Sequence, residues 1–227
     1  MSDHRGPGPA GRGPEPGEAH DALAGLFVYP DDGFPARLVG ARQALTRTDA
    51  AAAAELDRFA ADIERQSIEA MQELFTRTFD INPACALEVG WHLFGEEYLR
   101  GAFLVRMREE LRRLGLEESA ELPDHLTHVL AILARWSGER ADDFATACVL
   151  PAVDRMLQAL AGKDDPYESA LRAVRVFLAH RHGEPLAEAA GSAAWGQGSG
   201  ATGPRRPSWG PRWEPGAPER GPRGETL

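Results

Sequence analysis

The stretch EYLRGAFLVRMREELRRLGL, residues 97–116, carries the clearest secondary-structure signal in the chain. Its apolar residues recur every three or four positions and form one stripe, as on an amphipathic helix: Leu99, Phe103, Met107, Leu111 and Leu114. Acidic residues at its start and basic residues at its end suit the helix dipole, and Gly115 is a typical residue to follow a helix. The stretch therefore predicts a helix over Glu97–Leu114.

The same apolar periodicity continues on both sides of this helix. Upstream, it predicts helices over residues 22–29, 34–45, 49–63 and 68–79, and one that begins at Asn82-Pro83. Downstream, it predicts a helix from near Pro123, a helical region over residues 141–160 that Pro151 either kinks or divides, and a last helix from Asp165-Pro166. Neither the period-two alternation of strands nor a hairpin turn signal is found. The predicted fold class is all-α, a single helical bundle.

Composition divides the chain into three parts. Residues 1–20 contain 5 Gly and 4 Pro, and residues 191–227 contain 9 Gly and 6 Pro. Because such segments have few core-forming residues, we expect a disordered tail over 1–20, a helical domain over 21–183 and a second disordered tail over 184–227. Arg and Trp residues in the second tail suit either a short binding motif or a neutral extension, and the extension is the simpler interpretation.

The charge and hydropathy of the chain exclude several classes of protein. The formal net charge is -10, which disfavours binding to nucleic acid and to anionic lipid and suits a basic partner peptide. No run approaches the roughly 18 apolar residues of a membrane span, so we expect no stable membrane insertion. The first 20 residues lack the apolar segment of a secretory signal. We therefore expect a cytoplasmic location.

Sequence signals of catalysis are missing. The two cysteines, Cys85 and Cys148, lie in apolar helical patterns and are expected to be reduced and inert. There is no GxSxG nucleophile turn, no GxGxxG and no Walker-type phosphate loop. We therefore predict neither an enzymatic activity nor a bound cofactor.

The best metal-like cluster is formed by Asp124, His125 and His128. Asp124 and His128 are four residues apart, a spacing that places two ligands on one helix face. In a helix from Pro123, they would lie about 160° and 200° from Leu126, away from the apolar stripe, at about 100° per residue. They would then face solvent or a partner, with Asp124 also capping the first turn. No HExxH and no second acid–histidine pair completes a metal shell, so a metal-dependent hydrolase stays the less favoured alternative.

Four sequence blocks, in order, resemble the NarJ-type chaperones of the TorD/DmsD group. The first is Thr78–Ile81, which is similar to the family's TFDL block, and the second is His92–Gly95, followed by Arg100-Gly101. The third is Glu121–Leu126, similar to ELPDHLP, and the fourth is Asp165–Tyr167, similar to SPY. The resemblance covers residues 22–182. Thr127 departs from it, because the family pattern has a proline there, and Asn82-Pro83 replaces a basic pair.

This resemblance implies a fold, a function and a binding site. It implies a helical domain of the TorD/NarJ type that binds the apo catalytic (α) subunit of a respiratory nitrate reductase, including its N-terminal peptide, and keeps it competent for insertion of the molybdenum cofactor and for membrane assembly. Another molybdoenzyme is the alternative client. The implied peptide contacts are Pro123, Asp124 and His125, and the helix-face argument adds His128.

Overall fold

The computed structural model describes residues 17–185, and in this range every regular element is a helix. The predicted all-α class is therefore confirmed. The α-helices are α1 (Glu18–Ala24), α2 (Phe34–Thr48), α3 (Ala50–Ile63), α4 (Ile68–Phe75), α5 (Val89–Phe94), α6 (Tyr98–Arg113), α7 (Leu126–Leu133), α8 (Glu139–Phe144), α9 (Leu150–Leu160) and α10 (Tyr167–His182). Two 3₁₀ turns, η1 (Gly25–Phe27) and η3 (Pro83–Cys85), and two π-helical segments, η2 (Thr76–Asp80) and η4 (Ala145–Val149), complete the list.

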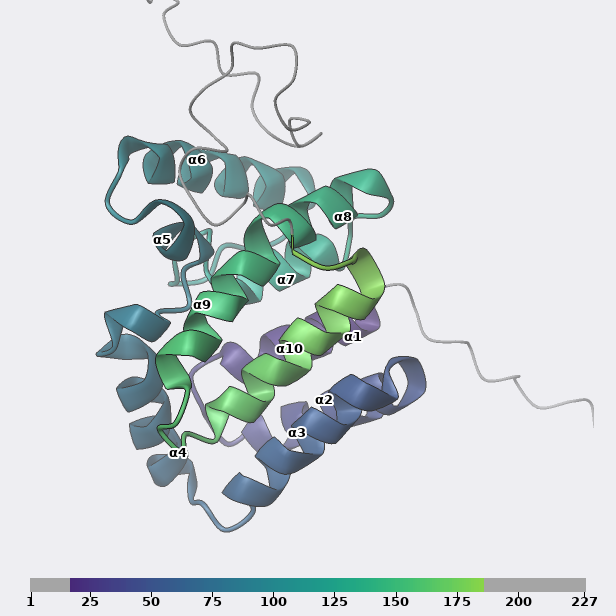
Figure 1. Cartoon of the computed structure of the whole chain (residues 1–227), viewed down its shortest axis with the longest axis vertical. Helices are drawn as coiled ribbons and strands as arrows, with labels where there is room; N and C mark the ends of the chain where they lie inside the picture. Colours follow the sequence, from purple (N-terminus) through teal and green to yellow (C-terminus); the bar gives the residue numbers. More distant parts are fainter. Residues whose placement is uncertain (1–16, 186–227) are drawn as a thin grey trace, which may run out of the picture.

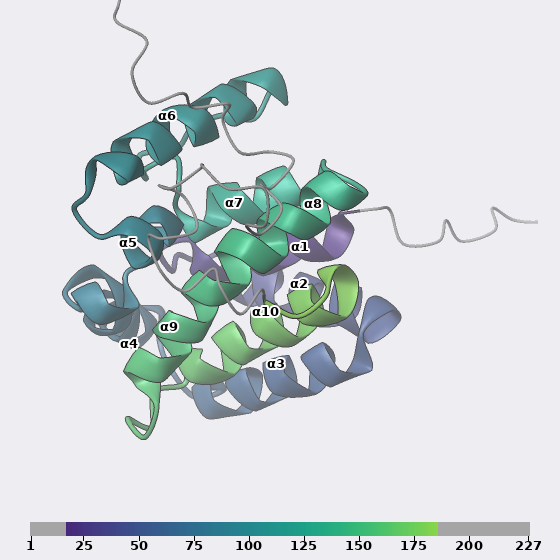
Figure 2. The same cartoon turned by 45° about the horizontal axis from the view of Figure 1, so that its top comes forward.

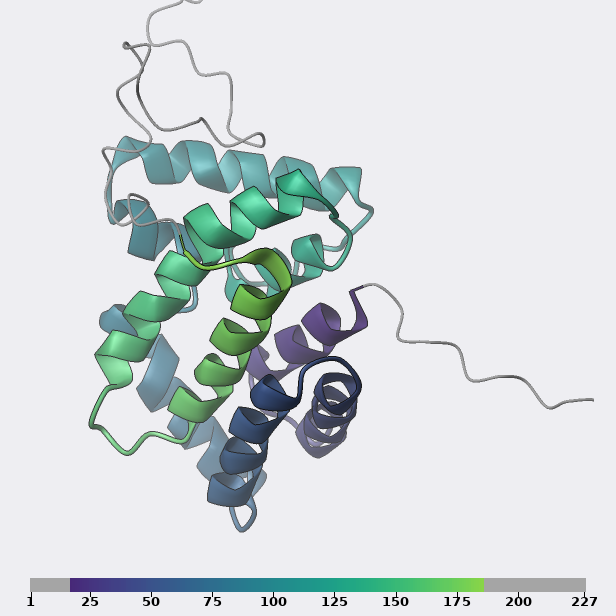
Figure 3. The same ribbon diagram turned by 45° about the vertical axis from the view of Figure 1, so that its right-hand side comes forward.

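The last helix lies in the middle of the bundle. α10 packs between α3 on one side and α9 on the other (Figure 1). α1 packs against α2 and α7 behind α10 in this view, and α6 lies along one end of the bundle, beside α5 and α7 (Figure 2). Seen from the side, α1 and α10 lie next to each other (Figure 3), and the His20 and Phe177 rings are in edge contact with centroids 4.8 Å apart.

Tyr167, the first residue of α10, lies at the centre of an aromatic cluster. Its fully buried ring has centroid distances of 4.8 Å to Phe79, 5.1 Å to Phe59, 5.8 Å to Phe75 and 6.5 Å to Phe27. Edge-on and tilted ring pairs at these distances stabilise a core beyond their buried area. The cluster joins α10 to α3, α4, η1 and η2, and thereby fixes the side of the bundle on which η2 lies.

Pro151 divides the long helical region, in agreement with one of its two predicted forms. It is the second residue of α9, and the π-helical segment η4 directly precedes this helix. A proline has no amide hydrogen, and its ring clashes with the carbonyl four residues earlier, here that of Ala147. The widened π turn of η4, between α8 and α9, accommodates both effects at this division.

The predicted boundaries differ from the structure most clearly at three places. α1 begins at Glu18, inside the predicted tail, and Ala19 and His20 are buried. The predicted helix from Asn82-Pro83 is only the 3₁₀ turn η3, and α5 follows at Val89. The helix expected from Pro123 begins at Leu126. Most of the second predicted tail, with its Arg and Trp residues, lies outside the described residues.

No helix among residues 17–185 combines the length and the hydropathy that crossing a membrane requires.

Candidate functional site

The segment Glu121–Leu126 turns at Pro123-Asp124, where the His125 amide donates to the Leu122 carbonyl at 2.9 Å, and it pairs with the residues that lead into α5. The Val89 amide donates to the Asp124 carbonyl at 2.9 Å, and the Leu126 amide donates to the Leu87 carbonyl at 2.8 Å. Between them, Glu88 and His125 form an isolated antiparallel bridge. Two segments more than 30 residues apart are thus held together by their backbones.

The side chain of Asp124 strengthens this junction. Its Oδ2 accepts a hydrogen bond of 2.9 Å from the Gly90 amide, in the first turn of α5. The first amides of a helix have no partner within the helix, and carboxylates are good acceptors for them. Asp124 therefore caps α5, a helix distant in sequence. The prediction that it caps the first turn of α7 is wrong.

The prediction that Asp124 faces solvent or a partner is wrong. Its side chain is fully buried, and within residues 17–185 its Oδ1 has no hydrogen-bond partner. Burial raises the pKa of this carboxyl to about 6, although the nearby Arg100 guanidinium acts in the opposite direction. Pro123 and Asp124 are not helical, so the angular positions predicted on a helix from Pro123 do not apply to them.

Gly90 makes the close approach of Asp124 possible. A Cβ at residue 90 would lie 2.7 Å from Asp124 Oδ2 and 2.8 Å from Cδ1 of Phe103. Both distances are shorter than real Cβ contacts, so a side chain at this position would displace the carboxylate or the ring. The junction between α5 and Glu121–Leu126 therefore requires a glycine here.

His128 is also buried, which corrects its predicted exposure. Its Nε2 accepts the Ser119 amide at 3.2 Å, and its Nδ1 lies 2.9 Å from the Leu122 carbonyl, to which it donates. The loop before α7 thus covers the polar face of α7, on which His128 lies. Because both ring nitrogens bind backbone groups, His128 is not available as a metal ligand. In the described part of the chain no cluster of three His, Cys, Asp or Glu residues could hold a metal ion.

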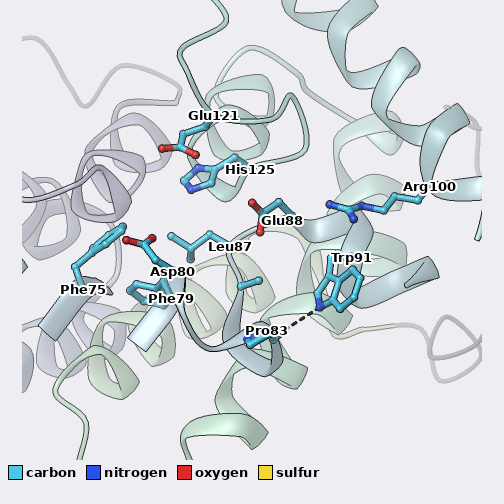
Figure 4. Close-up of a pocket in the computed structure, with 11 residues that line it drawn as sticks. Phe75, Phe79, Asp80, Pro83, Leu87, Glu88, Trp91, Arg100, Glu121 and His125 are labelled. Atoms are coloured by element: carbon cyan, nitrogen blue, oxygen red, sulfur yellow. Dashed lines mark hydrogen bonds between the residues drawn. The ribbon is translucent and has the colours of Figure 1, made fainter. Parts of the chain in front are cut away.

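A pocket of about 360 Å³ opens beside this junction (Figure 4). Of the four predicted peptide contacts, only His125 lines it; Pro123, like Asp124 and His128, is buried elsewhere. Its wall contains the aromatic side chains of Phe75, Phe79 and Trp91. The charged groups that line it are the carboxylates of Asp80, Glu88 and Glu121 and the guanidinium of Arg100.

One hydrogen bond and one cation–π contact hold the Trp91 side of the pocket in place. The Trp91 Nε1 donates to the Pro83 carbonyl at 2.8 Å, and the Arg100 guanidinium lies 5.3 Å from the centre of the Trp91 ring (Figure 4). A cation over an aromatic face is attracted by the ring quadrupole. This attraction keeps Arg100 against the wall. With three carboxylates and one guanidinium, the charged groups of the pocket lining are negative in sum.

The comparison with known families decides the identity of the chain. Residues 42–182, more than half of the chain, match the family described as nitrate reductase delta subunit. The chain belongs to the nitrate reductase delta subunit family. The predicted resemblance is thus confirmed. No curated protein sequence matches the chain.

A solved structure of similar fold supports the architecture of this delta-subunit family member. It is a crystal structure of a protein from Archaeoglobus fulgidus described as a candidate redox enzyme maturation protein. The two chains share 24% identity over 71% of this chain and 93% of the other, with a TM-score of 0.51. At this level of identity the comparison concerns the fold alone.

Two of the four sequence blocks of this delta-subunit family member, the first and the third, line the pocket. The first block supplies Phe79 and Asp80, the second is followed by Arg100, and the third supplies Glu121 and His125. The fourth block supports the first from behind, because the Thr78 hydroxyl donates to Asp165 Oδ2 at 2.6 Å. Of the residues that line the pocket, His125 alone had been predicted as a site residue. Glu88 and Trp91 are brought to the pocket by the backbone pairing with Glu121–Leu126, for which the sequence carries no signal.

Proposed function

We propose that this protein is a chaperone for the maturation of a respiratory nitrate reductase. It binds the apo catalytic (α) subunit, including its N-terminal segment, in the cytoplasm, and keeps it competent for insertion of the molybdenum cofactor and for membrane assembly. Membership of the delta subunit family supports a role with nitrate reductase. The protein's own contribution is binding, without bond chemistry.

The observation that carries this proposal is the lining of the pocket. Asp80, Glu88 and Glu121 create a negative opening that attracts a basic peptide and speeds its encounter. The aromatic wall offers contact area for the peptide's apolar side chains. Ile81 and Leu122, the sequence neighbours of Asp80 and Glu121, are 72% and 42% exposed and extend the apolar surface available to a client.

The first experiment is a binding measurement between the full-length protein and a synthetic peptide of the N-terminal segment of the nitrate reductase α subunit encoded by the same genome. The triple variant Asp80→Asn, Glu88→Gln, Glu121→Gln removes the negative lining. We expect its affinity to fall about tenfold or more at low salt, and the difference to shrink as salt is raised.

A matched control separates the pocket from the overall charge. The triple variant Asp32→Asn, Asp62→Asn, Glu64→Gln makes the same change in net charge at exposed positions that do not line the pocket. We expect its affinity to stay within about twofold of the parent. Equal loss in both triple variants would move the binding site elsewhere, and no binding by the parent protein would reject the proposed client.

A genetic test addresses the client in the cell. Deletion of the gene should abolish assembly of active nitrate reductase, and the intact gene should restore it. Unchanged nitrate reductase together with loss of another molybdoenzyme would reassign the client.

A further inference from the structure

The imidazole of His125 has a fixed arrangement of donor and acceptor in this chain. Its Nδ1 lies 3.3 Å from the Thr127 amide nitrogen and 2.8 Å from the Thr127 hydroxyl oxygen. A backbone amide can only donate a hydrogen bond, so Nδ1 must be the unprotonated, accepting nitrogen. The hydroxyl, which can rotate, is free to donate to the same nitrogen.

The single proton of the neutral ring is therefore on Nε2. Burial, followed by the nearby His128, lowers the pKa of His125 to about 4, which keeps the ring neutral at physiological pH. The other edge of the ring carries an N–H group, and within residues 17–185 this nitrogen has no hydrogen-bond partner given by the structure. Because His125 lines the pocket (Figure 4), the pocket wall contains one neutral hydrogen-bond donor.

The carboxylates that line the pocket determine which kind of hydrogen-bond acceptor can approach the Nε2–H group of His125. Glu88 and Glu121 line the same pocket as His125 (Figure 4). A ligand carboxylate or phosphate would be repelled by these groups, whereas an uncharged carbonyl oxygen would not. The ring of His128, with its centroid 6.3 Å from that of His125, does not compete, because both of its nitrogens bind backbone groups.

We propose that Thr127 sets the tautomer of His125, and that the resulting Nε2–H donates to a backbone carbonyl of the bound basic peptide. Thr127 is a positioning residue, since it acts only through His125. The proposal rests on the proposed function, because it specifies how that same pocket reads its peptide. It also gives a role to the departure from the family pattern at residue 127, where a proline would supply neither the amide hydrogen nor the hydroxyl.

The tautomer can be measured without any peptide. Long-range ¹H–¹⁵N NMR of the full-length protein distinguishes the protonated from the unprotonated ring nitrogen of His125. We expect protonated Nε2 in the parent protein and in Thr127→Val, which keeps the backbone amide. Thr127→Pro removes both donors, and we expect it to give a mixture of tautomers or protonated Nδ1. Pro151 occupies the same second position in α9, so a proline there is compatible with a helix start.

The second measurement adds the nitrate reductase α-subunit N-terminal peptide. We expect the His125 Nε2–H signal to shift on binding, Thr127→Pro to bind about tenfold more weakly, as for one lost hydrogen bond, and Thr127→Val to stay within about twofold. Protonated Nδ1 in the parent, an unchanged tautomer in Thr127→Pro, or binding that leaves the Nε2–H signal in place would overturn the inference. Absence of binding by a parent protein with protonated Nε2 would instead reject the proposed function, on which the peptide contact depends.

Discussion

At the scale of single residues, the contact between Gly90 and Asp124 controls the junction at the pocket. We predict that Gly90→Ala destabilises the protein by about 1–3 kcal/mol, because the new Cβ would overlap Asp124 Oδ2 and the Phe103 ring. Urea unfolding measures this free energy. Gly101→Ala, in α6, is the control: a Cβ there meets nothing within 4 Å, so the change should be neutral or stabilise by about 0.5–1 kcal/mol. Equal effects of the two substitutions would contradict the close packing at Gly90.

The buried carboxyl of Asp124 gives a pH-dependent prediction. Its pKa is raised from 3.8 to about 6, so the folded protein binds this proton more tightly than the unfolded chain does. This tighter proton binding adds to the free energy of unfolding. The contribution is fully present below pH 3.8 and is lost as pH rises through about 6. Asp124→Asn keeps an oxygen for the Gly90 amide and removes the titration. Relative to the parent, its free energy of unfolding should therefore rise by about 2 kcal/mol between pH 4 and pH 7. A difference between the two proteins that does not vary with pH would refute this.

At the scale of elements, one side-chain hydrogen bond joins the π-helical segment η2 to the start of α10. The Thr78 hydroxyl, almost fully buried, donates to Asp165, whose other oxygen accepts the Tyr167 amide. Thr78→Val preserves the shape of the side chain and removes the donor, so we expect a loss of about 1–3 kcal/mol in urea unfolding. Thr46→Val, at an exposed position in α2, should change stability by no more than about 0.5 kcal/mol. A similar loss in both variants would show that the bond to Asp165 contributes nothing of its own.

The comparison of predicted and observed elements shows where local sequence is sufficient. The helix over Glu97–Leu114 was predicted almost to the residue, because its stripe, end charges and terminal glycine all act within one segment. The helix from Pro123 was wrong by a full turn. There, the Leu126 amide donates to the Leu87 carbonyl, and the Val89 and Gly90 amides donate to the carbonyl and the carboxylate of Asp124. These tertiary hydrogen bonds outweigh the local helix signal of residues 123–125.

At the scale of the whole molecule, buried histidines make the fold sensitive to acid. Burial, with the neighbouring His182 and Arg181, lowers the pKa of His20 to about 3, and burial also lowers the pKa of His92 and of His182. A histidine whose pKa is lowered on folding binds fewer protons in the folded state, so stability falls as pH drops below about 6.5. This trend opposes the smaller contribution of Asp124.

His20 offers the sharpest test of this trend. His20→Gln should recover about 2 kcal/mol of the stability that the parent loses between pH 6.5 and pH 5, as measured by urea unfolding at several pH values. The parent protein, measured under the same conditions, provides the reference slope. If His20→Gln and the parent gave the same slope, protonation of His20 would not account for the loss.

The candidate site was predictable only in part, because most of its lining depends on how segments distant in sequence pack together. The resemblance located Glu121–Leu126, and His125 does line the pocket. The other lining residues were not predicted as site residues. Trp91, Glu88 and Phe75, for example, reach the pocket through the pairing of distant segments and the aromatic cluster around Tyr167, and neither leaves a pattern along the chain. Asp124 and His128 were misplaced because exposure was judged from one helix, without the loop and the α5 start that cover them.

The contact between α1 and α10 has a topological consequence. His20 and His182 are 162 positions apart in sequence, yet their Nε2 atoms lie 3.1 Å from each other. The path of the described chain therefore returns to its starting point and forms nearly a closed ring. Proteins with this property tolerate circular permutation and insertion into a host, because a short linker joins their ends. The helical domain could thus be reopened at the exposed residues 161–164 between α9 and α10, where the bond between Asp165 and Thr78 is kept, or carried as an insert by another protein.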